Sequence, residues 1–85
     1  MEYTLTFQEV LQKTLLEGNK GMFQGSEFKR GVFLKVSDFG DSLMLHEYKD
    51  KDDLFEHPLG NPVLSKGLIS QKYREVFTRQ DLFEY

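Results

Sequence analysis

The apolar residues of this chain change their spacing partway along it, and this change constrains the fold more than any other feature. In the first part, Phe7, Val10, Leu11 and Leu15 recur at three- and four-residue steps, as on one face of an α-helix. Thr6 and Glu9 have the spacing of a capping box, which predicts that the helix begins there. Gly18 predicts its end, because glycine adopts the left-handed conformation that closes a helix at no steric cost.

From Gly31 onward the apolar residues recur at every second position. Val32, Leu34 and Val36 alternate with Phe33 and Lys35, which predicts a strand buried on at least one face. Residues 38–41 have the composition of a turn, and residues 42–48 read as the returning strand. The two strands are therefore predicted to form an antiparallel hairpin.

Residues 49–62 carry many charges, both prolines of the chain and a Gly-Asn step. This composition predicts a surface loop, the most mobile part of the protein, that Leu54, Phe55 and Leu59 pin to the body.

The last quarter of the chain has two interpretations. Residues 63–69 read as a strand interrupted by Gly67, and residues 74–78 as another strand. Apolar residues there also fit helical spacing; they are Ile69, Tyr73, Val76, Phe77 and Phe83. The order of a helix followed by strands favours an α+β fold, with one N-terminal amphipathic helix packed on a four- to five-stranded antiparallel sheet. A chain of 85 residues is too short for two cores, so residues 1–85 are predicted to form a single domain.

Charge and cysteine content exclude several classes of partner. Eleven basic and fourteen acidic residues give a formal charge of −3, which offers no overall attraction to nucleic acid or to an anionic bilayer. There is no secretion signal and no apolar run of about 18 residues, so we expect a soluble protein without a membrane partner. The absence of cysteine excludes disulfides and thiolate metal sites, and it fits an intracellular setting.

The sequence contains no pattern typical of catalysis. His46 and His57 belong to no metal-binding motif, and there is neither a Cys nucleophile nor a serine flanked by glycines. His46 is expected to be a surface or half-buried histidine of a strand. Asp50, Asp52 and Asp53 lack the glycine and glutamate that complete a calcium loop. We therefore expect no enzyme activity, no metal and no cofactor.

The segment from Gly18 to Gly31 has the composition of a ligand-binding loop. It holds four of the seven glycines, two phenylalanines and three basic residues, but no phosphate-loop motif. Lys20, Lys29 and Arg30 could bind phosphate while Phe23 or Phe28 stacks on a base. The alternative is a connection whose phenylalanines anchor the core.

Three short stretches together resemble a family of small phage and prophage proteins, whose members include sponges that counter the Thoeris defence system. Members open with a Phe-led amphipathic helix that ends in Gly-Lys-Lys, similar to residues 7–11 and 18–20, although the helix here is one residue longer. A Trp, a Gly/Lys/Asn stretch and an apolar strand follow in the family, and Phe28, residues 29–31 and residues 32–34 are similar, with Phe in place of Trp. Near the C-terminus, residues 79–83 resemble the family's Gln-x-Asp-Leu-Leu segment, but its following Asp-Trp has no counterpart.

This resemblance implies a non-enzymatic protein that sequesters a small cyclic nucleotide-derived signal in the cytoplasm of the host cell. It also implies a helix packed on an antiparallel sheet, and a homo-oligomer, a dimer or a tetramer. The expected ligand-binding residues are Phe28, Lys29, Arg30, Gly31, Gln80 and Asp81. Asp81 is expected to orient a ribose hydroxyl or the facing subunit.

Two other functions are compatible with the sequence. One is a small acidic inhibitor of a host enzyme, which presents residues 50–56 with Leu54 and Phe55 as its anchors. The other is a structural phage protein.

Overall fold

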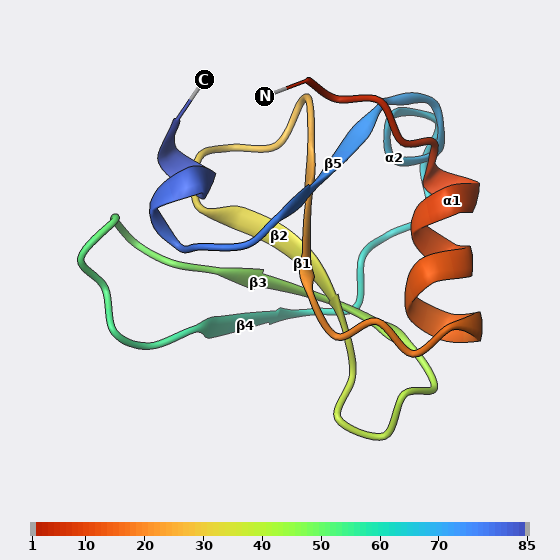
Figure 1. Cartoon of the computed structure of the whole chain (residues 1–85), viewed down its shortest axis with the longest axis horizontal. Helices are drawn as coiled ribbons and strands as arrows, with labels where there is room; N and C mark the ends of the chain where they lie inside the picture. The colour runs from red at the N-terminus through yellow and green to blue at the C-terminus, as the bar shows by residue number, and fades with distance from the viewer. Residues whose placement is uncertain (1, 85) are drawn as a thin grey trace.

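The computed structural model describes residues 2–84 and has the α+β arrangement that the sequence predicts. One N-terminal helical segment packs beside a sheet of five antiparallel strands (Figure 1). The strand order is β4-β3-β2-β1-β5. The elements are α1 (Phe7–Leu11), η1 (Gln12–Leu16), β1 (Met22–Gly25), β2 (Val32–Val36), β3 (Leu43–Glu47), β4 (His57–Gly60), α2 (Lys66–Ser70), β5 (Tyr73–Val76) and η2 (Gln80–Phe83).

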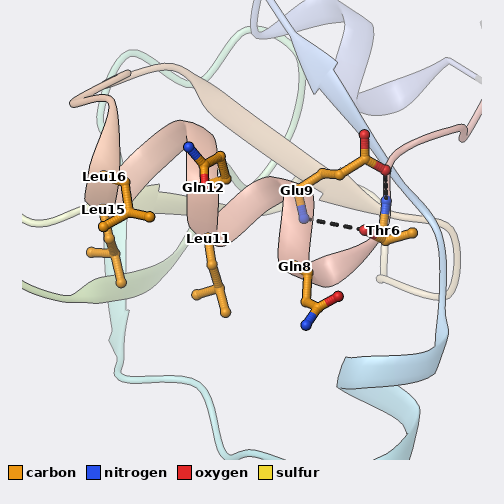
Figure 2. Close-up of a pocket in the computed structure, with 7 residues that line it drawn as sticks. All are labelled: Thr6, Gln8, Glu9, Leu11, Gln12, Leu15 and Leu16. Atoms are coloured by element: carbon orange, nitrogen blue, oxygen red, sulfur yellow. Dashed lines mark hydrogen bonds between the residues drawn. The ribbon is translucent and has the colours of Figure 1, made fainter.

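The first helix begins and ends as its sequence predicts. The Glu9 amide donates to Thr6 Oγ1 at 3.1 Å and the Thr6 amide donates to Glu9 Oε1 at 3.0 Å, which completes the capping box (Figure 2). At its other end Gly18 has a φ of +75°. Between them η1 is a π-helix, in which Glu17 N donates to Gln12 O. Because a π turn closes five residues back, it takes one residue more than an α turn.

The predicted hairpin is present and lies inside the sheet. All five residues of β2 pair with β3, from Val32 opposite Glu47 to Val36 opposite Leu43. β1 lies on the other side of β2 and pairs with β5. A single bridge between Leu5 and Tyr73 continues the pairing on the outer side of β5.

The sheet is apolar on both faces. Leu34 points to the face that the helix covers, where it joins a core of Phe7, Val10, Phe23, Leu43, Leu68 and Tyr73. Phe33 points to the opposite face and packs with Val76 and Leu82. η2 therefore closes a second, smaller core on the face away from α1.

The structure corrects the sequence prediction in two segments. Residues 63–69 are not a strand, because Ser65 caps the short helix α2 by accepting from the Leu68 amide at 3.1 Å. Residues 49–62 are only partly a loop, because β4 pairs with β3. Leu54 and Phe55 do not pin this loop to the body, since 74% and 72% of their surface is exposed, and Leu59 is 49% exposed.

No helix within residues 2–84 has the length and apolar composition needed to cross a membrane.

Candidate functional site

Phe28 and Lys29 lie in the connection between β1 and β2, which is tied to the start of β5. Ser26 N donates to Lys72 O at 2.8 Å, and Glu27 N donates to Gln71 Oε1 at 2.9 Å. The half-buried Phe28 ring stands edge-on to Tyr73, with 5.8 Å between the ring centroids. Burial raises the pKa of Tyr73 to about 12, so its hydroxyl stays protonated even at alkaline pH.

The same two residues line an open groove of about 480 Å³, which we call the ligand groove. Its walls come from the β1–β2 connection, from β2, β3 and β4, and from the segment that includes α2. The other residues that line it are Glu27, Val32, Leu45, Leu59, Pro62, Val63, Ser65, Gly67, Leu68 and Gln71. Lys29 stands at the rim with 82% of its side chain exposed, and its Nζ lies 4.0 Å from Glu47 Oε2. The volume falls within the range of small-molecule sites.

Gly31 has a structural role outside the ligand groove. Its φ is +88°, and a Cβ built on it would lie 2.3 Å from the Tyr48 carbonyl oxygen and 2.8 Å from the Phe83 ring. Its carbonyl accepts from the Tyr48 amide at 3.0 Å, and its amide donates to Leu82 O at 3.3 Å. A side chain would therefore push β2, β3 and η2 apart.

Gln80 and Asp81 lie in η2, which does not line the ligand groove. Asp81 is held through its backbone: its amide donates to Thr78 O, and its carbonyl accepts from Arg74. Arg30 is exposed and does not line the groove either. Of the six predicted site residues, Phe28 and Lys29 therefore line the ligand groove, Gln80 and Asp81 lie in η2, and Gly31 packs against η2.

Arg74 is a buried cation that the sequence did not mark as special. Only 4% of its surface is exposed, and it donates to Gln24 Oε1 at 2.7 and 2.9 Å and to the carbonyls of Asp81 and Glu84. It also lies 5.0 Å from the centroid of the Tyr3 ring. Gln24 is fully buried and donates in turn to Leu82 O at 3.0 Å. The only available signal was the alternation in β5, which places Arg74 on the face opposite Tyr73.

Residues 50–56, which we call the acidic loop, are held by a dense set of hydrogen bonds. The Asp53 carboxylate accepts from the amides of Lys49 and Phe55 and lies 3.0 Å from His57 Nε2. These bonds, led by the one from Lys49, lower the pKa of Asp53. From the outside, Arg79 donates to the carbonyls of Lys51 and Asp53. The side chain of Leu54 is thus exposed, while hydrogen bonds hold the backbone on either side of it.

Glu56 anchors the acidic loop to the sheet. Its carboxylate accepts from Lys35 Nζ at 3.2 Å and from the Tyr48 hydroxyl at 3.3 Å. His46 Nδ1 lies 3.4 Å from Glu56 Oε2 without the alignment of a hydrogen bond, and it is buried. Desolvation lowers the pKa of His46 against the opposing effect of Glu56. His46 is half-buried, as the sequence predicts, and it packs on Phe33.

Within residues 2–84, no three His, Cys, Asp or Glu side chains come together in a way that could hold a metal ion. Comparison with known proteins found no matching family model, no matching curated protein and no matching solved structure.

Proposed function

We propose that this protein is a non-enzymatic binding protein of the phage anti-defence kind, which sequesters a small cyclic nucleotide-derived signal in the ligand groove. One observation carries the proposal. Phe28 and Lys29, which the sequence selected as a stacking ring and a phosphate-binding cation, line the same open groove.

The groove offers the two kinds of contact that such a ligand needs. Stacking of a base on an aromatic ring is worth about 1–3 kcal/mol, and a hydrogen bond from a cation to phosphate about 1.5–3 kcal/mol. Together they are less than the roughly 8 kcal/mol of micromolar affinity. The apolar walls around Val32, Leu45 and Leu68 must therefore supply part of the binding free energy.

Of the six residues predicted to bind the ligand, the proposal keeps Phe28 and Lys29. Gly31 and Asp81 serve the packing of η2, and Gln80 and Arg30 lie outside the groove lining. Substitution of Gln80 should therefore leave ligand affinity unchanged, in contrast to what the resemblance implies.

Isothermal titration calorimetry with cyclic dinucleotides and cyclic ADP-ribose isomers tests the proposal. We expect one member of this panel to bind wild-type protein, and Lys29→Ala to weaken its binding by about tenfold or more, the loss of one charge-assisted hydrogen bond. Phe28→Ala should weaken it further through the loss of stacking. Lys20→Ala is the matched control, because Lys20 is an exposed lysine that does not line the groove.

Because Phe28 also packs on Tyr73, circular dichroism must show that Phe28→Ala is folded. Lys29→Ala should not disturb the fold, since the Lys29 side chain is largely exposed. Sequestration without cleavage predicts that the ligand is recovered chemically unchanged after the protein is denatured. No binding by wild type across the panel, or equal loss in Lys20→Ala and Lys29→Ala, would contradict the proposal.

The acidic inhibitor that the sequence also allows would use Leu54 and Phe55. Both side chains are exposed, which is compatible with that function.

A further inference from the structure

The acidic loop presents two large apolar side chains on a backbone that is already ordered. Leu54 and Phe55 are 74% and 72% exposed, while Asp53 and Arg79 hold the loop by five hydrogen bonds to its backbone and to His57. Docking such a loop costs little conformational entropy, because its backbone is fixed before contact.

A second apolar surface lies at the other end of the molecule. The face of the first helix and the segment before and within α2 enclose a hollow of about 430 Å³, which we call the apolar groove. Apolar residues that line it include Phe7, Leu11, Leu15, Leu43, Leu64 and Ile69. Figure 2 shows Leu11 and Leu15 projecting from the same side of the helix. Leu64 and Ile69 remain 70% and 54% exposed, and neighbouring Val63 is 82% exposed.

The acidic loop and the wall of the apolar groove that includes α2 are opposite in charge. Residues 50–56 contain three Asp and one Glu against the single Lys51. Residues 62–72, which form one wall of the apolar groove, contain Lys66 and Lys72 and no acidic residue. Opposite charges at the rim of an apolar contact steer association and select its orientation.

We propose that the acidic loop of one copy of this chain docks in the apolar groove of a second copy. In Figure 1 the acidic loop projects at one side of the molecule, whereas α1 and α2 lie at the opposite side. Two copies placed side by side in opposite directions bring each loop to the other's groove, so a two-fold axis makes both contacts at once and closes the assembly as a dimer. Phe28 and Lys29 do not line the apolar groove, so the variants that test ligand binding differ from those that test the dimer.

Sedimentation equilibrium over a range of protein concentrations, at low and at high salt, tests the proposal. We expect wild type to form a dimer whose dissociation constant rises with salt. The double variant Leu54→Ser and Phe55→Ser should raise that constant about 30-fold or more, since two apolar anchors are lost. Both side chains are exposed in the single chain, so the fold should be unaffected. Phe39→Ser is the matched control, because Phe39 is 93% exposed in another acidic turn, and it should leave the dimer intact.

Charge reversal identifies the two surfaces as partners. Asp50→Lys with Asp52→Lys should give monomers, and Lys66→Glu with Lys72→Glu should also give monomers. An equimolar mixture of the two double variants should recover the dimer, because both of its loop-to-groove contacts then join opposite charges. Wild type that stays monomeric, a dimer that tolerates the Leu54 and Phe55 changes, or a mixture that stays monomeric would each overturn the proposal. A loop that binds only a different protein gives the first of these results.

Discussion

A residue that the sequence marks as special can be required by packing. Gly31 stood out beside Lys29 and Arg30 as the end of a ligand loop, yet it is required where β2, β3 and η2 meet. Its backbone conformation and the nearby Tyr48 carbonyl both exclude a side chain. A sequence marks such a glycine as special without showing which neighbour makes it so.

Gly31→Ala should therefore be strongly destabilising. The left-handed backbone alone costs about 1–2 kcal/mol for a residue with a side chain, and the close approach to Tyr48 O adds to it, for a total of about 3 kcal/mol or more. Urea unfolding measures the loss. Gly40→Ala is the matched control, because Gly40 has a φ of +76° and open space around it. Its free energy of unfolding should fall only by the cost of the left-handed backbone. Equal losses in the two variants would show that contact with Tyr48 does not constrain this position.

His46 should make stability depend on pH. Burial lowers its pKa in the folded protein below the ordinary value of 6.5, while Glu56 and Asp38 oppose that effect and Lys35 adds to it. Below pH 6.5 the unfolded chain binds a proton that the folded protein does not, so stability present above that pH is lost as the pH falls toward the folded pKa. Urea unfolding midpoints should drop between about pH 7.5 and about pH 5.5, and the drop should be smaller in His46→Gln. A His46 pKa at or above 6.5 in an NMR titration would contradict this expectation.

At the scale of elements, local sequence signals predicted correctly those elements that are stabilised by residues close together in the chain. The capping box, the apolar stripe and Gly18 predicted the first helix, alternation predicted β2, and the turn after β2 predicted β3 as the returning strand. In contrast, α2 has only five residues, and beyond its Ser65 cap it is held by Tyr73, whose hydroxyl donates to the Leu68 carbonyl. β4 contains Pro58 and Gly60, which disfavour a strand, and it exists because β3 offers an edge to pair with. Each of these two elements depends on residues outside it, so the periodicity of its own residues does not predict it.

The acidic loop is a further element whose order depends on a distant residue, and this gives a prediction. Arg79 donates to the carbonyls of Lys51 and Asp53 and lies 5.8 Å from the centroid of the Tyr48 ring. Arg79→Ala should speed amide hydrogen exchange in residues 51–55 by about ten- to hundredfold, since bonds from a cation are lost. Arg79→Lys keeps the charge without the two-pronged geometry and should give an intermediate rate. Amides of β2 serve as the internal control, and unchanged exchange in residues 51–55 would show that Arg79 does not order the loop.

At the scale of the whole molecule, Arg74 and Gln24 connect parts that are far apart in the chain. They join β5 and β1 to the carbonyls of Leu82, Asp81 and Glu84, and the Tyr3 hydroxyl donates to Gln24. The segments before α1 and after η2 are therefore fastened to the same pair of residues. Within residues 2–84 no carboxylate forms an ion pair with Arg74, so carbonyl and amide oxygens stabilise this buried cation.

The sequence by itself determined the α+β class, the first helix, the central hairpin and the placement of Phe28 and Lys29 in one connection, because each depends on residues close together in the chain. Only the tertiary structure decided the strand order, the helix α2, the second core under η2 and the separation of Gln80 and Asp81 from the ligand groove. Each of these follows from which distant surfaces exclude water together and which buried donors find acceptors, and spacing along a chain does not encode either.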